Sequence, residues 1–252
     1  MLEIKNLSYQ VEADGEELGI LQNIDLTVPD GKLVVITGPN GGGKTTLARA
    51  IMGLAQPTAG QIIWNGTDVT HASITERSKL GISYAFQQPP RFKGLRIGDL
   101  LELAAGKPLT HDQQCKYLTR VGLCANDYIG REMDASLSGG EVKRVEIATI
   151  LARNAELMIF DEPEAGIDLW SFARLTETFR AIHDKQDSTI LIISHQERII
   201  RLADEIILIS GGRVSERGSV EEIYPKILRD TVAPCDLVSP DPTKAEEARG
   251  WN

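Results

Sequence analysis

The residues that could do chemistry begin with a glycine-rich run. Gly38-Pro-Asn-Gly-Gly-Gly-Lys44-Thr45 matches the pattern G-x-x-x-x-G-K-[ST] and stands between the apolar run Leu33 to Ile36 and a helical pattern. Glycines let the backbone wrap inward, so that successive N–H groups point at phosphate oxygens, and the following helix adds its positive end. We expect Lys44 to reach the β- and γ-phosphates of a nucleotide and Thr45 to ligate Mg²⁺.

A pair of carboxylates follows a second apolar run. Leu157 to Phe160 reads as a buried strand that ends in Asp161 and Glu162. Open α/β sheets bind ligands at the carboxyl ends of their strands. We expect Asp161 to hold the Mg²⁺ shell and Glu162 to polarise an attacking water. The alternative interpretation is an exposed acidic turn. It is less favoured here because the same chain contains a phosphate loop.

A third pattern, Leu137-Ser138-Gly139-Gly140-Glu141, precedes a helical stretch. Ser-x-x-Glu is also a capping box, which would explain Ser138 and Glu141 as an ordinary helix start. That explanation leaves the two adjacent glycines without a reason, because glycine weakens a helix start. Close approach of the backbone to a phosphate accounts for them.

The elements that must position these residues alternate between strands and helices. Short strands are expected at 2–9 and 18–28, joined by an Asp14-Gly15 turn, and at 33–36, 61–64, 82–86, 157–161, 189–194 and 205–210. Gly211-Gly212 leads into a hairpin strand, and Ser219 to Glu222 forms a capping box for a last helix. Residues 88–136 show helical periodicity and no convincing strand.

This pattern predicts an α/β fold with a mostly parallel sheet, an antiparallel β edge and an inserted helical subdomain. The nucleotide-binding core is expected at 1–87 and 157–231. The helical subdomain is expected at 88–156 and a loosely held tail at 232–252.

Composition narrows the classes of function. The chain has 252 residues, 42% hydrophobic, and a formal charge of −9, which argues against a nucleic-acid ligand. No apolar run approaches bilayer length and no signal peptide is evident, so we expect a cytoplasmic protein without direct membrane insertion. Cys115, Cys124 and Cys235 form no zinc or disulfide pattern, and a plain thiol is the expected state of Cys235.

The order of these motifs resembles the ATP-binding-cassette (ABC) ATPases, whose signature is similar to Leu137 to Glu141. The resemblance spans about residues 1 to 230 and implies a P-loop ATPase that uses ATP and Mg²⁺. It implies ATP-binding positions at Tyr9, Gly38, Asn40, Gly41, Gly43, Lys44, Thr45, Thr46, Ser138, Gly139, Gly140, Glu141 and Asp168. It places metal ligands at Thr45, Gln87 and Asp161, and catalytic groups at Glu162, His195 and Lys44.

Several of these roles rest on the family alone. Tyr9 resembles the aromatic that stacks on adenine, although a tyrosine on a strand face would look the same. Gln87 is similar to the glutamine that touches Mg²⁺ and water and joins the two lobes. Ala165 to Asp168 resembles the loop that crosses to a second subunit, and His195 the histidine that senses the γ-phosphate.

Two cellular functions are consistent with an ATPase of this kind. The run Glu141-Val-Lys-Arg144-Val-Glu146 and the segment after His195 resemble the SUF-system (SufC-like) ATPases of iron–sulfur cluster assembly, which implies a SufB-like scaffold partner. Pro163 and the short helical region are more typical of the ATP-binding subunit of a transporter, whose partner is a transmembrane permease. Lys143, Arg144 and Glu146 could also form merely a solvated helix face. The SUF interpretation is the leading one at this point.

The partner surface is expected just after Gln87. Pro89-Pro-Arg-Phe-Lys-Gly94 combines an aromatic side chain, two cations and rigid backbone, the residue types that anchor interfaces. An exposed turn is the plainer interpretation of the same run.

The family resemblance predicts how activity depends on protein concentration. The signature of one copy is expected to complete the phosphate site of another, so that a homodimer forms on ATP binding with two working sites. ATP turnover per chain should therefore rise with protein concentration, because a monomer lacks Ser138 at its γ-phosphate. Steady-state ATPase assays over a dilution series test this, and a flat turnover per chain would contradict it.

Overall fold

The computed structural model describes residues 1–13 and 16–232. The expected Asp14-Gly15 turn, Cys235 and the tail after Val232 lie outside the described residues.

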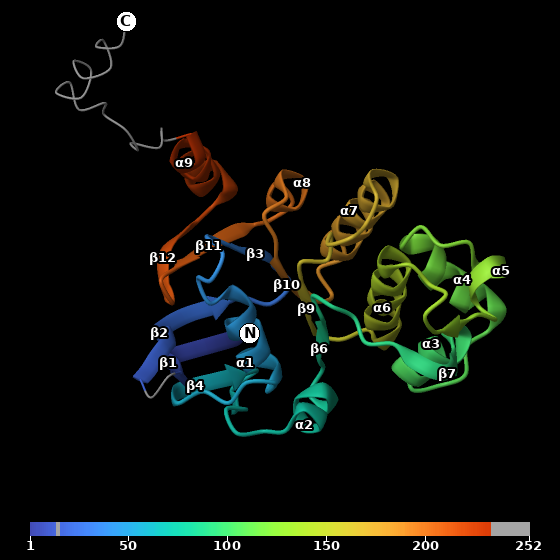
Figure 1. The fold of residues 1–252 in the computed structure, drawn as a ribbon, viewed down its shortest axis with the longest axis horizontal. Coiled ribbons are helices and arrows are strands. Elements are labelled where there is room, and N and C mark those ends of the chain that lie inside the picture. The colour runs from blue at the N-terminus through green and yellow to red at the C-terminus, as the bar shows by residue number, and fades with distance from the viewer. Residues whose placement is uncertain (14–15, 233–252) are drawn as a thin grey trace, which may run out of the picture.

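A six-stranded sheet forms the centre of the molecule (Figure 1), in the order β12-β11-β3-β10-β9-β6. Every neighbouring pair is parallel except β11 with β12 at one edge. The parallel strands are continuous apolar runs because both of their faces are covered. The six strands are β3 (Leu33–Thr37), β6 (Ile82–Ala85), β9 (Leu157–Asp161), β10 (Thr189–Ile193), β11 (Glu205–Ser210) and β12 (Arg213–Gly218).

A second, antiparallel sheet in the order β2-β1-β4-β5 lies beside the central sheet, with helix α1 (Lys44–Met52) between the two (Figure 1). Side chains of β3 alternate between two cores, as a strand covered on both faces requires. Val34 and Ile36 pack with α1 and the antiparallel sheet, whereas Leu33 and Val35 pack on the opposite side. The four strands are β1 (Leu2–Ala13), β2 (Glu16–Val28), β4 (Ala59–Trp64) and β5 (Thr67–Asp68).

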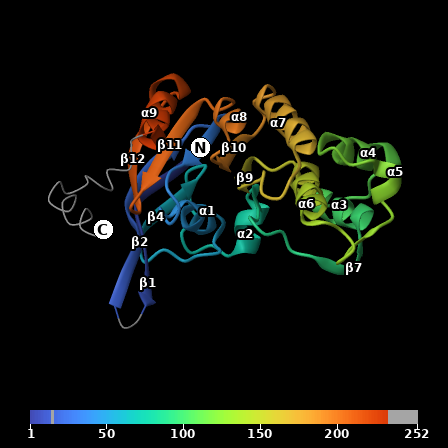
Figure 2. The same cartoon turned by 45° about the horizontal axis from the view of Figure 1, so that its top comes forward.

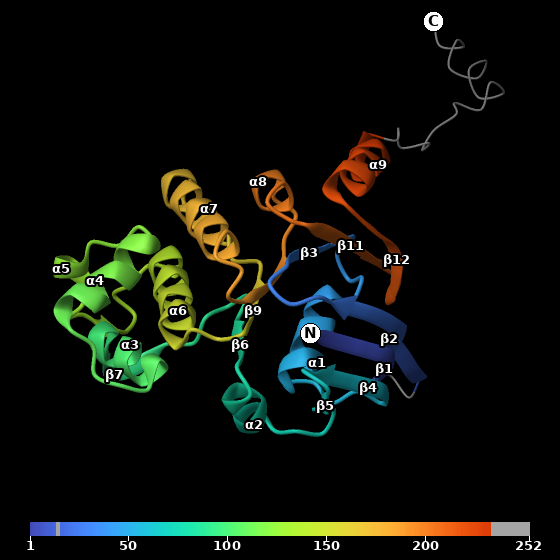
Figure 3. The same cartoon turned by 180° about the vertical axis from the view of Figure 1, so that it is seen from behind.

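Helices cover the other face of the central sheet (Figure 3). They are α6 (Gly139–Arg153), α7 (Leu169–His183), α8 (Glu197–Ile200) and α9 (Val220–Val232). The predicted capping box at the start of α9 is present, since Ser219 N–H donates to Glu222 and Glu222 N–H donates to the Ser219 hydroxyl. Within the described ranges 1–13 and 16–232, no helix has the length and apolar character to cross a membrane.

The far end of α1 is held by a buried cation. Arg77, on the short helix α2 (Ile74–Lys79), is fully buried and donates to the carbonyls of Ala50 at 2.6 Å and Ile51 at 2.7 Å. A cation suits a helix C-terminus, where carbonyls lack partners inside the helix. Arg77 therefore anchors the helix whose opposite end carries the phosphate loop.

The segment between β6 and α6 holds α3 (Ile97–Ala105), α4 (His111–Arg120) and α5 (Ala125–Tyr128), which lie on the far side of α6 from β9 (Figure 2). The sequence-based expectation of no strand over 88–136 was wrong. β7 (Phe92–Arg96) pairs with β8 (Glu132–Met133) as a small antiparallel sheet. The pairing leaves little pattern in the sequence, because β8 has two residues and Gly94 interrupts β7 with a φ of 84°.

Candidate active site

The phosphate loop runs from the end of β3 to the start of α1, and its glycines are required by its neighbours. A Cβ on Gly38 would lie 2.0 Å from the Ile209 carbonyl oxygen, and one on Gly43 would lie 2.9 Å from that of Ile20. Both glycines also have positive φ, 132° and 100°. The loop is therefore clamped between β11 and β2, and only glycine allows that approach.

The loop borders a hollow of about 530 Å³, lined by residues 40–46 together with Ile20, Gln87 and Glu162. Lys44 donates to the carbonyls of Gly38 at 2.7 Å and Pro39 at 2.9 Å, which keeps the loop folded around its ammonium group. Burial lowers the pKa of Lys44, opposed by the charges of Glu162 and Asp161. A cation, a concave backbone and a helix N-terminus together fit a nucleotide phosphate chain.

Two side chains that could ligate a metal through oxygen, those of Thr45 and Asp161, meet beside this hollow, and Thr45 lines it. The Thr45 hydroxyl donates to the Asp161 carboxylate at 3.1 Å, and the Tyr84 hydroxyl donates to its other oxygen at 2.7 Å. Burial raises the pKa of Asp161, while the hydrogen bonds from Tyr84 and Thr45 oppose that shift. Hydroxyl and carboxylate oxygens are the ligands that Mg²⁺ prefers, and a bound Mg²⁺ would neutralise charge on the phosphates.

Glu162 follows Asp161 in a strained backbone conformation. Its φ is 45°, which is uncommon for a residue with a side chain, and its N–H donates to the Ile193 carbonyl at 3.0 Å. Its carboxylate accepts a 2.7 Å hydrogen bond from the Gln87 amide. The carboxylate is thereby held at the edge of the hollow, where a general base for water attack would stand.

His195 lies just beyond the end of β10. Its Nδ1 is 3.2 Å from the Thr37 hydroxyl at the end of β3. Partial desolvation and then the charge of Lys44 lower the pKa of His195, which favours the neutral imidazole. A neutral ring can accept or donate a hydrogen bond beside the phosphate loop, as the predicted γ-phosphate sensor must.

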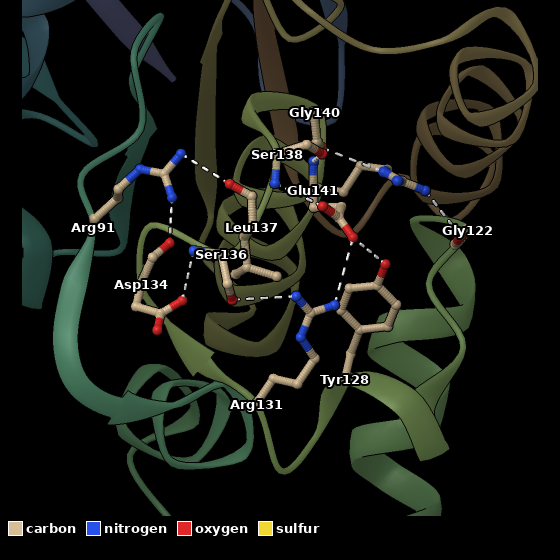
Figure 4. Close-up of polar contacts among 11 residues, drawn as sticks. Arg91, Gly122, Tyr128, Arg131, Asp134, Ser136, Leu137, Ser138, Gly140 and Glu141 are labelled. Carbon is tan, nitrogen blue, oxygen red and sulfur yellow. Dashed lines mark hydrogen bonds and ion pairs between the residues drawn. The ribbon is translucent and has the colours of Figure 1, made fainter.

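The signature motif begins α6 through a capping box (Figure 4). Ser138 N–H donates to Glu141 at 2.7 Å, and Glu141 N–H donates to the Ser138 hydroxyl at 3.3 Å. Tyr128 also donates to the Glu141 carboxylate, and the Ser138 and Tyr128 hydrogen bonds lower its pKa to about 2. The Glu141 side chain is therefore engaged within its own chain.

The two signature glycines have different surroundings. A Cβ on Gly140 would lie 2.6 Å from the Gly166 carbonyl oxygen, so this glycine is required where α6 passes the predicted crossing loop. A Cβ on Gly139 would have nothing within 4 Å, and Gly139 is exposed. Close approach to a phosphate of a second copy stays a prediction, and Gly139 is the glycine with room for it.

One chain does not bring all the predicted site residues together. Among the described residues that line the hollow, none belongs to the signature, and within residues 1–13 and 16–232 no hydrogen bond joins the signature to the phosphate loop. Asp168 caps α7 by accepting from Trp170 and Ser171 N–H at 3.0 Å. Tyr9 packs against the core under the antiparallel sheet and is not among the residues described as lining the hollow.

Three residues near the site were not predicted to act there. Tyr84 holds Asp161 through its hydroxyl, and its signal is a phenol in the short buried strand β6, where Ser83 is the other polar residue. Lys143 and Glu146 are 1% and 7% exposed, so the alternative of a solvated helix face was wrong for both. Lys143 donates to the carbonyls of Phe86 and, at 3.2 Å, Asp161, and Glu146 accepts from Phe86 N–H at 2.8 Å.

Comparison with known proteins decides the family. The family model described as ABC transporter matches residues 21–165. The chain belongs to the ABC transporter family. It is an ABC-type ATPase that binds and hydrolyses MgATP, and the predicted P-loop fold with a parallel sheet and antiparallel edge is confirmed.

Relatives extend this assignment. An ABC transporter ATP-binding protein of Methanocaldococcus jannaschii is 38% identical over 212 residues, covering 81% of this chain and 84% of the relative. The sulfate/thiosulfate import ATP-binding protein CysA of Synechocystis is 38% identical over 209 residues, but the match spans only 58% of that protein. A dimeric ABC transporter cassette superimposes with a TM-score of 0.80 at 23% identity, over 87% of this chain and 99% of that one, which supports the fold.

Substitution of Tyr84 tests the geometry of the metal-binding carboxylate. Tyr84→Phe removes the hydroxyl that orients Asp161 and should lower the apparent Mg²⁺ affinity in ATP hydrolysis about tenfold, as for other partners of metal ligands. ATPase assays titrated with Mg²⁺ measure this. Tyr117→Phe on α4 is the matched control and should behave like the unaltered chain; equal Mg²⁺ curves for both variants would refute the role.

Proposed function

We propose that this ABC ATPase is the ATP-binding subunit of a membrane transporter and acts at the cytoplasmic face of a transmembrane permease. The observation that carries the proposal is the similarity to transporter ATP-binding proteins, at 38% identity over most of both chains in one case. The comparisons favour this alternative over the SUF interpretation. Coordinated hydrolysis would be transmitted to the permease through the helical region.

A homodimer is part of the proposal. The hollow of one chain is lined by the phosphate loop, Gln87 and Glu162, with Asp161 bonded to Thr45, and Ser138 is not among its described lining residues. Beside the predicted crossing loop, Leu169 and Trp170 are 65% and 85% exposed. Large exposed apolar side chains favour an interface. Face-to-face closure of two copies would cover such side chains and supply each hollow with a signature.

Iron–sulfur cluster assembly with a SufB-like scaffold is the second candidate. It is favoured by the Lys143-Arg144 pair and Glu146, which resemble the SUF pattern. Burial of Lys143 and Glu146 gives both residues contacts within this chain, and these contacts explain them without an iron–sulfur partner. The pattern therefore supports this candidate less strongly than the sequence alone indicated.

Capture of the partner separates the two candidates. Glu162→Gln should slow hydrolysis and hold the ATP-bound dimer, because the carboxylate at the hollow is lost while its hydrogen-bonding shape remains. Tagged Glu162→Gln protein is incubated with MgATP and separately with cytosol or detergent-solubilised membranes, and bound proteins are identified by mass spectrometry. The expected result is a polytopic membrane protein; a soluble scaffold-type protein from cytosol would overturn the transporter proposal.

The partner surface is proposed at Pro89 to Gly94, directly after Gln87. Phe92 is 41% exposed at the start of β7 and follows Gln87, whose amide contacts Glu162, by five residues. An exposed aromatic side chain is a typical anchor for an interface. A partner bound here would contact the segment that begins just after Gln87, the residue predicted to touch Mg²⁺.

Replacement of Phe92 tests this surface. Phe92→Ala should reduce capture of the partner by about tenfold, the effect of losing one anchor side chain, while MgATP affinity stays unchanged. Pull-down yield and nucleotide titration measure the two quantities. Leu103→Ala removes a more exposed apolar side chain on α3, 67% exposed, and should have no effect. Unchanged capture by Phe92→Ala would exclude this surface.

A further inference from the structure

The segment from Phe86 to Arg91 is tied to the signature region at both of its ends. It begins at the end of β6, includes Gln87, and runs toward β7. One cation of the signature region binds backbone carbonyls of this segment. One cation of this segment binds backbone carbonyls of the signature region. One of the two cations, Lys143, also donates to the Asp161 carbonyl at 3.2 Å.

The first contact comes from α6 and is buried. Lys143, two residues beyond the capping Glu141, donates to the carbonyls of Phe86 and of Gln87, the latter at 3.4 Å. Its charge is balanced by Glu146 at 3.8 Å, whose carboxylate accepts from Phe86 N–H at 2.8 Å. Burying a cation is costly unless it is paired and hydrogen-bonded, so this arrangement fixes the Phe86–Gln87 backbone against α6.

The second contact runs in the opposite direction (Figure 4). Arg91 extends from the same segment and donates to the carbonyls of Asp134 and, at 3.0 Å, Leu137. Leu137 directly precedes Ser138. A planar guanidinium that binds two carbonyls restrains both the distance and the orientation of the groups it joins.

We propose that Lys143 and Arg91 are positioning residues that form a two-point linkage between Gln87 and the signature loop. The Gln87 amide contacts Glu162 at one nucleotide site. Because the segment that follows Gln87 is fastened to residues on both sides of Ser138, a shift of Gln87 is passed to the signature offered to the other copy. The inference rests on the proposed dimer and adds to it the residues that couple the two sites.

Arg91→Ala is the primary test, since Arg91 is exposed and its loss does not disturb the core. The protein concentration that gives half-maximal ATP turnover should rise about tenfold, as expected when the two charge-assisted hydrogen bonds of an exposed guanidinium are lost. MgATP affinity measured at concentrations that keep the chain monomeric should not change. If Arg91 had only a structural role, the half-maximal protein concentration and the MgATP affinity would change together. Lys107→Ala removes an exposed cation after α3 and serves as the control.

A paired replacement tests the second point of the linkage. Lys143→Gln together with Glu146→Ala removes both buried charges at once, so that neither is left unpaired. This variant should also raise the half-maximal concentration, and adding Arg91→Ala should raise it no further, because a linkage broken at one point is already lost. Independent, additive effects would overturn the linkage. If the paired variant fails to fold, Arg91→Ala decides alone.

The outcomes distinguish the two proposals. If turnover of the unaltered chain does not depend on concentration, the dimer is refuted and the linkage with it. If the unaltered chain shows the dependence and Arg91→Ala matches Lys107→Ala, the dimer stands and the linkage is overturned.

Discussion

The active site depends on the parallel register of the central sheet. Ile193 of β10 is paired with Ile36 of β3 on one side and with Asp161 of β9 on the other. Ala85 of β6 is paired with Phe160 in the next position. The four strands therefore end at one edge, and the loops that follow them carry the phosphate loop, the carboxylates, His195 and Gln87. A slip of one residue in any strand would turn its side chains to the other face and dismantle the site.

Within that frame, the two carboxylates are held in arrangements that cost free energy, one through burial and the other through backbone strain. Asp161 is buried and is compensated by Tyr84 and Thr45, whereas Glu162 occupies a strained backbone conformation. Such costs are typical of pre-organised sites, where groups must be in place before the transition state forms. The buried Arg77 at the far end of α1 has a related purpose, because it fixes the helix whose first residue is Lys44.

The signature region combines residues that stabilise α6 within the chain with residues that remain exposed. Its serine and glutamate cap α6, and one of its glycines is required by packing against Gly166. The remaining glycine and the Ser138 backbone are exposed, and the hollow within the same chain has no contact with them. In the proposed dimer, this arrangement would divide the groups that act on ATP between two surfaces of one molecule, and hydrolysis would depend on how two such molecules meet.

The sequence by itself determined the family, the phosphate loop, the carboxylate pair and most of the strands, because these features are contiguous and their chemistry is readable in a few residues. Its expectation of a purely helical insertion failed, since the β7–β8 pairing lies in backbone contacts that leave almost no side-chain pattern. Only the tertiary structure revealed the contacts of Tyr84, Lys143 and Arg91. Tyr84 and Asp161 are 77 residues apart, and Arg91 and Leu137 are 46 apart. The hydrogen-bond partners of a polar side chain are the groups that folding brings beside it. Spacing along the chain does not reveal partners at such separations.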